Sequence, residues 1–335
     1  MKIENYDTEK KVFIVAEIGN NHEGSYTLAE EMIGKAAEAG ACAVKFQTIV
    51  PEELVSISQK DRIEQLERFQ LSYDEFERLS KVAKHENILF LSTPFDIESV
   101  HFLDSIVPAF KIASGDNNFF PLIEAIAQTG KPIIMSTGLM DLPEVRKTID
   151  FILNIWNENA IDQDIAIMHC VTSYPTALEE ANLLAIKELQ SLNVTVGYSD
   201  HTIGTEAAVL SVALGARIVE KHFTIDKNYS DFRDHQLSAD TKEFSQLVER
   251  IENASKLLGQ SRKTVQESEK LVMEKVRRSI VARKDLDENT VLTLDDISWV
   301  RPGGGLAPGN EKIILGKRLK EKVAVGELIT LDNLK

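Results

Sequence analysis

Cysteine is scarce in this sequence, which has only Cys42 and Cys170 among its 335 residues. Both lie inside or beside apolar segments, so we interpret them as small buried side chains and expect no disulfide framework. Basic residues are also in the minority, with 38 Lys and Arg against 53 Asp and Glu, which gives a net charge of −15. A chain this acidic is not expected to bind nucleic acid or an anionic membrane.

Long apolar runs are absent as well. No run approaches the ~20 residues that cross a bilayer, so we expect no transmembrane helix and no membrane partner. Residues 1–5 do not show the basic and then apolar pattern of a secretion signal, so we expect a cytoplasmic location. If so acidic a protein binds an anion, it must do so through a local basic pocket.

A third absence bears on the fold. The first apolar segment, residues 11–18, is not followed by the glycine-rich turn that a doubly wound sheet more often carries. Instead, apolar segments alternate with helix-compatible segments across residues 1–260. The predicted strands span residues 11–18, 43–49, 88–94, 110–114, 132–137, 164–170, 195–200 and 217–224. Eight strands at this spacing predict an α/β fold of the (β/α)₈ TIM-barrel type.

The pattern changes after Gly259. Residues 261–276 are charged and have no strand character, so we interpret them as a linker. Residues 277–335 contain short β-like pieces separated by Gly and Pro turns, notably Arg301-Pro302-Gly303-Gly304-Gly305. This composition predicts a small second β-rich domain, which is of marginal size to be stable alone.

Polar side chains mark the carboxyl ends of the predicted strands, which meet at one mouth of such a barrel. The residues that we expect there are Glu17, Lys45, Gln47, Thr93, Lys111, Ser114, Asp116, Thr137, His169, Thr172, Tyr174, Ser199, His201, Lys221 and His222. His201 and His222 end two consecutive strands joined by one helix. Two neutral imidazoles placed in this way could hold one divalent metal, and the alternative is a pair of core histidines bonded to backbone groups.

Lys45 and Lys111 each interrupt an apolar strand, in V-K-F and F-K-I. A buried lysine without a partner carries a large desolvation penalty, so an anion or a carboxylate must compensate it. Two lysines among several hydroxyls suit a ligand with a phosphate and a carboxylate. The alternative is a structural ion pair with a barrel carboxylate such as Glu17 or Glu220.

These strand ends belong to longer motifs. They are A-E-I-G-N-N-H-E-G (16–24), A-V-K-F-Q-T (43–48), L-S-T-P-F-D (91–96), K-I-A-S-G-D (111–116), K-P-I-I-M-S-T-G (131–138), Y-P-T (174–176), Y-S-D-H-T-I-G (198–204) and E-K-H-F-T (220–224). In this order they resemble the sialic acid synthase family. The R-P-G-G-G motif at 301–305 resembles the antifreeze-like SAF domain that this family carries at its C-terminus.

The resemblance implies condensation of phosphoenolpyruvate with an N-acetylmannosamine-type aldose. The products are phosphate and a nine-carbon 2-keto-3-deoxy acid of the N-acetylneuraminate or legionaminate type. It also implies a divalent metal, typically Mn²⁺ with Mg²⁺ or Co²⁺ as alternatives. A domain-swapped homodimer is implied too, with each C-terminal domain lying over the partner's barrel.

The family's site residues map onto matching positions of this chain. The resemblance implies that His201 and His222 are the metal ligands. It implies that the phosphoenolpyruvate pocket consists of Lys45, Thr93, Lys111, Ser114 and Ser199. It also implies that the residues facing the sugar are Glu17, Gln47, Tyr174, Asp234 and Arg301. Asp116 stands where the family commonly has glutamate, and Thr172 stands where members acting on N-acetylmannosamine often have asparagine. Either Glu17 or Asp116 is the candidate to orient the attacking water.

Three alternatives remain open from the sequence. A Schiff-base aldolase could use Lys45, Lys111 or Lys221 as its nucleophile. A phosphorylated sugar acceptor would require basic residues near its far end, for which Arg233 is the candidate. A binding module on an inactive barrel is the third alternative, although a scaffold would not need so many polar strand ends.

Overall fold

The chain forms two compact units, Met1–Gly259 and Gln260–Lys335, in a computed structural model. The structure describes residues 1–335 except for the side chain of Arg233. The first unit contains the eight-stranded sheet and the second contains a small β-rich fold. Each unit is described by itself.

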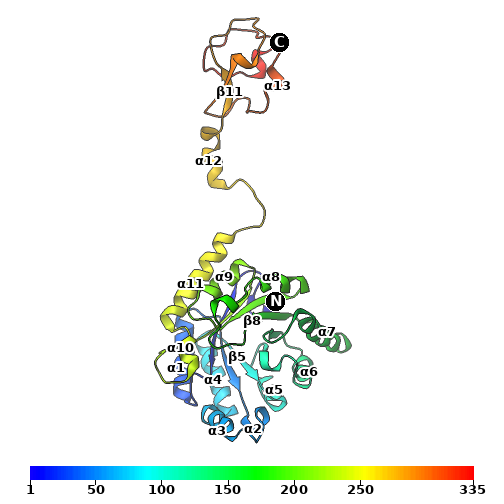
Figure 1. Ribbon diagram of the computed structural model, residues 1–335, viewed down its shortest axis with the longest axis vertical. Coiled ribbons are helices and arrows are strands. Elements are labelled where there is room, and N and C mark those ends of the chain that lie inside the picture. Colours follow the sequence, from blue (N-terminus) through cyan, green and yellow to red (C-terminus); the bar gives the residue numbers. More distant parts are fainter. The chain divides into compact units, whose positions relative to one another are not determined.

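Eight parallel strands form the sheet of the first unit (Figure 1). They are β3 (Phe13–Gly19), β4 (Ala43–Thr48), β5 (Leu89–Pro94), β6 (Phe110–Ile112), β7 (Ile133–Ser136), β8 (Ile165–Cys170), β9 (Thr195–Asp200) and β10 (Ile218–His222). Their order is β5-β4-β3-β10-β9-β8-β7-β6, and β5 also lies beside β6, so the sheet curls into a barrel. The predicted TIM-barrel fold is therefore confirmed.

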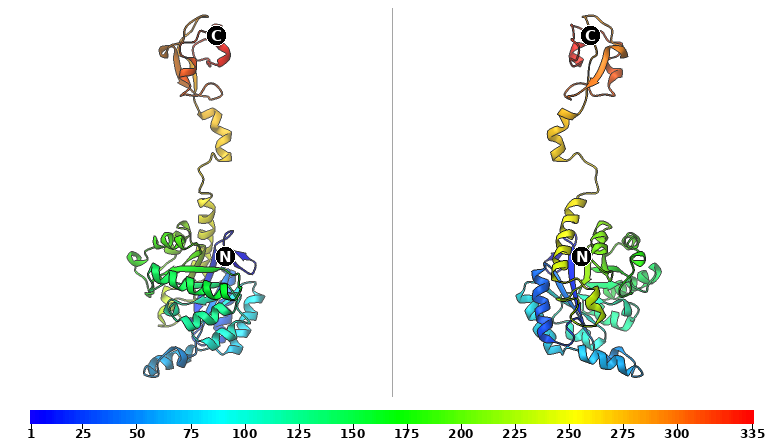
Figure 2. Two further views of the ribbon diagram at one scale, coloured as in Figure 1. Left: turned by 90° about the vertical axis from the view of Figure 1, so that its right-hand side faces the viewer. Right: turned by 60° about the vertical axis from the view of Figure 1, so that its left-hand side comes forward.

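Helices surround this barrel (Figure 2). They are α1 (Tyr26–Glu38), α2 (Pro51–Leu54), α3 (Lys60–Phe69), α4 (Tyr73–His85), α5 (Ile97–Leu103), α6 (Phe120–Gln128), α7 (Leu142–Glu158), α8 (Ala185–Leu189), α9 (Glu206–Ala213), α10 (Arg233–Leu237) and α11 (Thr241–Leu258). Side-chain caps begin several of them: Ser72 and Asp240 form capping boxes with the glutamates three residues later. The connection from β4 to α4 is longer than a simple crossover and adds α2 and α3.

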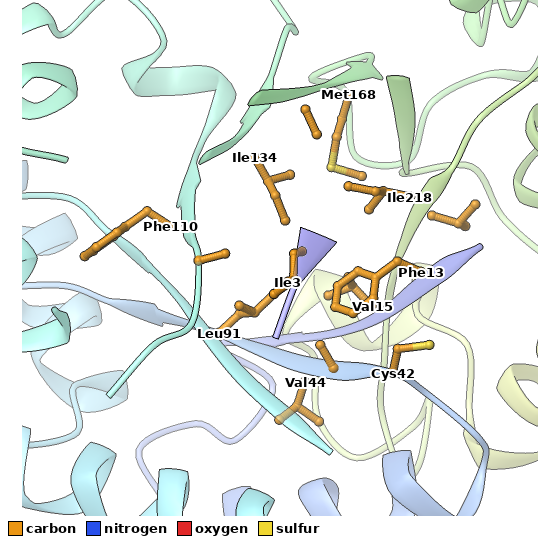
Figure 3. Close-up of a cluster of buried hydrophobic side chains, with 14 of the residues drawn as sticks. Ile3, Phe13, Val15, Cys42, Val44, Leu91, Phe110, Ile134, Met168 and Ile218 are labelled. Carbon is orange, nitrogen blue, oxygen red and sulfur yellow. The ribbon is translucent and has the colours of Figure 1, made fainter. Parts of the chain in front are cut away.

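The strands are mainly apolar because both of their faces are buried, one by the helices and the other by the barrel interior. An N-terminal hairpin, β1 (Lys2–Ile3) with β2 (Tyr6–Asp7), adds Ile3 to the interior, where it lies near Phe13, Leu91 and Ile134 (Figure 3). The amino group of Met1 lies 3.2 Å from the Oγ1 of Thr195, where β9 begins. The hairpin therefore lies at the amino ends of the strands and leaves the carboxyl ends open.

The second unit contains α12 (Glu267–Val276), β11 (Ser279–Ala282), β12 (Ile297–Val300) and α13 (Glu311–Ile314). β11 and β12 pair antiparallel, and single bridges such as Leu286 with Val323 extend the β structure. Its small core is separate from that of the barrel and includes Ile280, Leu292 and Ile314.

Across the described part of the chain, none of the helices combines the length and the apolar character needed to cross a membrane.

Candidate active site

The carboxyl ends of the barrel strands surround a cavity with two connected parts. The inner chamber has a volume of about 60 Å³ and is lined by Lys45, Lys111, Glu220 and hydroxyl side chains. The outer compartment has a volume of about 1040 Å³ and extends to α3 and to the loop before α10. Gln47, Ser114, Tyr174 and His222 line both parts, so one path joins them.

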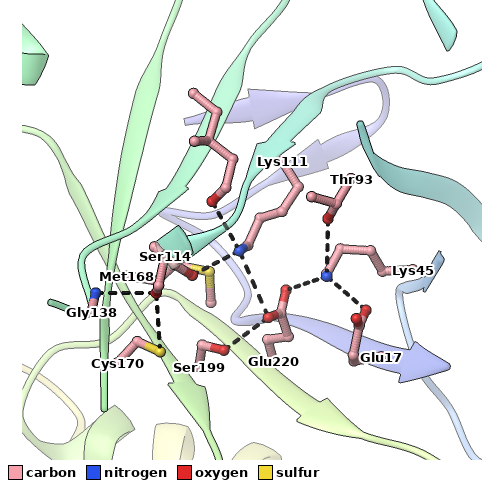
Figure 4. Close-up of polar contacts among 12 residues, drawn as sticks. Glu17, Lys45, Thr93, Lys111, Ser114, Gly138, Met168, Cys170, Ser199 and Glu220 are labelled. Carbon is pink, nitrogen blue, oxygen red and sulfur yellow. Dashed lines mark hydrogen bonds and ion pairs between the residues drawn. The ribbon is translucent and has the colours of Figure 1, made fainter. Parts of the chain in front are cut away.

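Four charged side chains form an ion-pair network in the inner chamber (Figure 4). The Nζ of Lys45 lies 2.7 Å from Glu17 and 3.6 Å from Glu220. The Nζ of Lys111 lies 3.9 Å from the same Glu220 and donates to the Oγ of Ser136 at 2.7 Å. Glu220 thus lies between the two lysines, and it also accepts a hydrogen bond from Ser199 at 2.8 Å.

Burial and the neighbouring charges shift the pKa values of these four side chains in opposite directions. Burial raises the pKa of Glu17, and Lys45 only partly opposes the shift. Burial also favours protonation of Glu220, but its two lysine neighbours outweigh this and lower its pKa. For Lys45, burial is outweighed by Glu17 and Glu220, which raise its pKa, whereas burial lowers the pKa of Lys111. The charged forms of these side chains therefore depend on one another.

The structure thus shows the ion-pair alternative for both lysines. The external anion that the sequence predicts as their partner would meet a chamber in which Glu17 and Glu220 lie 2.7 and 3.6 Å from Lys45, and Glu220 lies 3.9 Å from Lys111. The pairing joins β3, β4, β6 and β10, which are distant in sequence and come together only when the barrel closes. An anion that enters the chamber must therefore exchange with these carboxylates.

His201 and His222 lie side by side, with ring centroids 5.4 Å apart. Two imidazoles that share one metal at about 2.1 Å have ring centres roughly 4.5–5.5 Å apart, so the spacing fits one ion. The Nδ1 of His201 is 2.9 Å from the carbonyl oxygen of Val171, which orients the ring and leaves Nε2 for a metal. Within the described residues, no cluster of three or more His, Cys, Asp or Glu is arranged for a metal. Water and substrate oxygens would complete the coordination.

Lys221 is not part of this site, contrary to the expectation from its position at a strand end. Its side chain is 1% exposed, and its Nζ lies 3.1 Å from Asp200 and 2.5 Å from the carbonyl oxygen of Thr202. Successive side chains of a strand point to opposite faces. Glu220 and His222 therefore face the cavity while Lys221 faces away, where its pair with Asp200 joins β9 to β10.

The outer compartment begins with a chain of hydrogen bonds from the ion-pair network. Gln47 donates to Glu17 at 3.1 Å and accepts from Asn20 at 3.0 Å. Thr172, Tyr174 and Asp234, to which the family resemblance drew attention, also line this compartment. On α3, Arg62, Gln65, Arg68 and Phe69 form a further wall that the sequence did not lead us to expect.

Thr137 and His169, which we expected at the strand ends, are not among the described residues that line either part of the cavity. Twelve of the fourteen residues that the family resemblance assigns to the site do line the cavity. They are Glu17, Lys45, Gln47, Thr93, Lys111, Ser114, Thr172, Tyr174, Ser199, His201, His222 and Asp234. Asp116 is absent from the described lining of both parts, although the preceding Gly115 lines the outer compartment. Arg301 belongs to the second unit.

Five of the described inner-chamber residues did not receive a site role from the sequence, and three of them, Glu220, Ser136 and Cys170, have polar or titratable side chains. Glu220 was considered only as an ion-pair partner, and its central position depends on the barrel geometry. Ser136 ends β7 and is the hydroxyl partner of Lys111. Cys170, interpreted as a buried apolar residue, is indeed buried but lines the chamber, with its Sγ 3.7 Å from the Nδ1 of His201. The position of these three residues at or near the carboxyl ends of their strands is the sequence feature that could have identified them.

Comparisons with known proteins show the family to which the chain belongs. Residues 32–263 match the model of the NeuB family, and residues 277–335 match that of the SAF domain. MJ1065, an uncharacterized protein of Methanocaldococcus jannaschii, is 43% identical over 96% of this chain and 94% of its own length. The N,N'-diacetyllegionaminic acid synthase of Legionella pneumophila is 36% identical over 96% of this chain and 94% of its own length.

A solved structure gives the same result. The N-acetylneuraminic acid (sialic acid) synthetase of Leptospira borgpetersenii, in complex with citrate, superposes with a TM-score of 0.74 at 37% identity. The match covers 79% of this chain and 90% of that one. With its barrel, its polar cavity and its C-terminal SAF domain, the chain belongs to the NeuB family of nonulosonic (sialic) acid synthases.

Proposed function

We propose that this protein condenses phosphoenolpyruvate with the open-chain form of an N-acyl mannosamine-type aldose. The products are a nine-carbon 2-keto-3-deoxy acid and phosphate. The observation that carries the proposal is the pair of buried ammonium groups, Lys45 and Lys111, in a hydroxyl-lined chamber. That chamber opens past His222 and Tyr174 into a compartment with room for a sugar.

Phosphoenolpyruvate binding follows from the charges of the inner chamber. Its phosphate and carboxylate groups take Lys45 and Lys111 as partners, with Thr93, Ser114 and Ser199 as hydroxyl donors. The anion thereby displaces a carboxylate from Lys45. Glu17, which Gln47 holds at 3.1 Å, is then available to orient or deprotonate a water. We favour Glu17 over Asp116 for this role because Glu17 lines the chamber.

The reaction forms one carbon–carbon bond and one carbon–oxygen bond from water, and it breaks the carbon–oxygen bond to the phosphate. The methylene carbon of phosphoenolpyruvate attacks the aldehyde carbon, and the aldehyde oxygen takes up a proton. Water adds to the carbon that bears the phosphate and loses a proton to Glu17. Collapse of this tetrahedral carbon expels phosphate and leaves the 2-keto acid. Holding both reactants in line along the cavity is a positioning effect that can supply several kcal/mol.

A divalent metal fits His201 and His222. Mn²⁺ is our first candidate, with Mg²⁺ or Co²⁺ as alternatives, and oxygen ligands from water and substrate suit all three. When bound, it would supply Lewis-acid polarisation of the aldehyde oxygen. The carbonyl of Val171 keeps the imidazole of His201 oriented, and the cavity keeps the two substrates adjacent.

Phosphate release from phosphoenolpyruvate tests the proposal. The assay uses a panel of aminosugars, with EDTA or with added Mn²⁺. We expect release that needs an aminosugar, disappears in EDTA and returns with Mn²⁺. His201→Ala should lose the metal response, and Lys45→Met should raise the KM for phosphoenolpyruvate. If no aminosugar causes release, the proposal is wrong.

The acceptor is the part of the proposal that the panel must resolve. N-acetylmannosamine and 2,4-diacetamido-trideoxy hexoses are the main candidates, and the compartment of about 1040 Å³ has room for either. A phosphorylated sugar is included because Arg62 and Arg68 line the outer compartment. The side chain of Arg233, the residue that the sequence suggested for a phosphate, lies outside what the structure describes.

A Schiff-base aldolase is a second candidate because burial lowers the pKa of Lys111, as such a nucleophile requires. Trapping with pyruvate and borohydride distinguishes the two candidates. We expect no covalent adduct at Lys111, because its ammonium is engaged by Ser136 and Glu220. An adduct that inactivates the enzyme would favour the aldolase.

We also propose a domain-swapped homodimer in which the SAF unit of one copy covers the barrel of the other. Residues 260–335 contain fifteen of the 38 Lys and Arg but only twelve of the 53 Asp and Glu. The second unit therefore carries a net charge of +3 and residues 1–259 carry −18. Opposite charges favour such docking, which would bring Arg301 to the partner's cavity. Light scattering with and without residues 260–335 tests the dimer.

A further inference from the structure

The loop from β10 to α11, residues 223–240, supplies one wall of the outer compartment. Ser230, Asp231, Phe232 and Asp234 all line that wall. The bridge of Phe223 with Ala239 pairs the base of the loop. The tip, by contrast, includes only the short helix α10 and needs other contacts to keep its position.

Two side chains supply these contacts, Glu23 from the loop after β3 and His235 from α10. The Nε2 of His235 lies 3.1 Å from the Oε1 of Glu23, and its Nδ1 lies 2.7 Å from the Oγ1 of Thr224. Ser230 also donates a hydrogen bond to the Oε1 of Glu23. His235 is fully buried, with Tyr229 and Phe232 packed against its ring. We call Glu23 and His235 the loop clamp.

Hydrogen-bond roles in the loop clamp require a proton on the Nε2 of His235. Glu23 offers only acceptors when ionised, so the 3.1 Å contact needs a donor on the imidazole. Thr224 can accept from an Nδ1–H or donate to a bare Nδ1. In either case, Nε2–H donates to Glu23. A glutamine side chain at 235 can reproduce this donor, whereas an asparagine can reproduce only the Nδ1 side.

The backbone at Glu23 supports a specific role for this carboxylate. Glu23 has φ +47°, in the left-handed region that side chains other than glycine rarely adopt. Gly24 follows with φ +78°, and a Cβ there would collide with the carbonyl oxygen of Arg68 on α3. A strained non-glycine residue at the edge of a cavity is often retained because its side chain has a function.

We propose that Glu23 and His235 are positioning residues for the sugar acceptor. Their contact holds α10 against the loop after β3, and this places Asp234, the neighbour of His235, at the wall of the outer compartment. Glu23 also lines the outer compartment, whereas His235 does not. Neither residue lines the inner chamber, so phosphoenolpyruvate binding does not depend on the loop clamp. The inference rests on the proposed function for its substrate, but the contact itself can be tested without any substrate.

Amide hydrogen exchange of the full-length protein without substrates tests the contact. We expect His235→Asn and Glu23→Ala to speed the exchange of residues 225–237 about tenfold, the effect of losing one buried hydrogen bond. His235→Gln should stay within about twofold of the wild type because it keeps the donor to Glu23. Glu31→Ala, an exposed carboxylate on α1, is the control and should leave the exchange unchanged.

Steady-state kinetics tests the consequence for the acceptor. His235→Asn and Glu23→Gly should raise the KM for the aminosugar about five- to tenfold and leave that for phosphoenolpyruvate within about twofold. Glu23→Gly also relieves the strained φ, so a raised KM in a protein no less stable than the wild type separates positioning from folding. Equal effects of Asn and Gln at 235, or equal changes in both KM values, would overturn the inference. If the wild type releases no phosphate, the proposed function fails, and hydrogen exchange alone decides on the loop clamp.

Discussion

Replacement of Glu220 by glutamine tests whether charge holds the inner chamber together. The change keeps the shape of the side chain and the hydrogen bond from Ser199, but it leaves Lys45 and Lys111 with Glu17 as their only carboxylate in the network. At 3.6 and 3.9 Å, each lysine interacts with Glu220 by about 4 kcal/mol at an effective dielectric constant of about 20. The desolvation of these charges offsets much of this sum. Removing one partner of a buried pair nevertheless costs about 3–5 kcal/mol.

We therefore expect Glu220→Gln to lower the free energy of unfolding by about 3 kcal/mol, near the lower limit because the Ser199 bond remains. Urea denaturation followed by far-ultraviolet circular dichroism measures the loss. Glu252→Gln is the matched control, because Glu252 pairs with Lys11 at 2.9 Å on the surface and both side chains are well exposed. That exposed pair should contribute less than about 1 kcal/mol.

The same urea denaturation can be repeated in the presence of phosphoenolpyruvate. Saturating phosphoenolpyruvate should restore stability to Glu220→Gln more than it stabilises the wild type, because the anion replaces the missing carboxylate beside both lysines. A ligand at 100 times its Kd adds about 2.7 kcal/mol. If Glu220→Gln and Glu252→Gln proved equally stable, the network would not be held by its charges. Stabilisation of the wild type alone would argue against anion binding at the lysines.

Three further predictions concern other buried groups. Lys221→Met should cost about 3–5 kcal/mol in urea denaturation, because it leaves the buried Asp200 without its ammonium partner, and a cost below about 1 kcal/mol would contradict this. Burial lowers the pKa of His22 to about 4, so stability should fall as the pH decreases from 7 to 4, by up to about 3 kcal/mol. The urea midpoint of His22→Gln should show less of this acid dependence. Burial raises the pKa of Asp116 to about 6, so its contribution to stability is lost as the pH rises through 6. Asp116→Asn should therefore be more stable than the wild type at pH 7.5 and similar to it near pH 4.

The sequence predicted the architecture well because burial leaves a direct signature in composition. A strand covered on both faces is mostly apolar, and all eight predicted strands agree with the structure to within two residues at each end. The polar residues at the strand ends could be assigned to one mouth of the barrel because parallel strands end at the same edge. Twelve of the 27 described residues that line the two parts of the cavity followed from this rule and from the family resemblance.

The assignment of strand-end residues to the barrel mouth was wrong for Lys221, although the alternation of side chains along its strand could have corrected it. Side chains alternate between the faces of a strand, so Glu220 and His222 cannot face the cavity unless Lys221 faces away. Applying the alternation to E-K-H would have assigned Glu220 to the cavity in place of Lys221. The sequence did not reveal the wall formed by α3, because nothing in residues 60–69 indicates which face of that helix meets the cavity.

The sequence by itself determined the eight strands, the position of His201 and His222 at two strand ends and the presence of two buried lysines, because the apolar pattern of each strand records these features locally. Only the tertiary structure decided the partners of those lysines. Glu17, Lys45, Lys111 and Glu220 come from four strands, and their distances depend on the order and stagger in which the barrel closes. Contacts among strands far apart in the chain are set by that closure, so no local pattern records them.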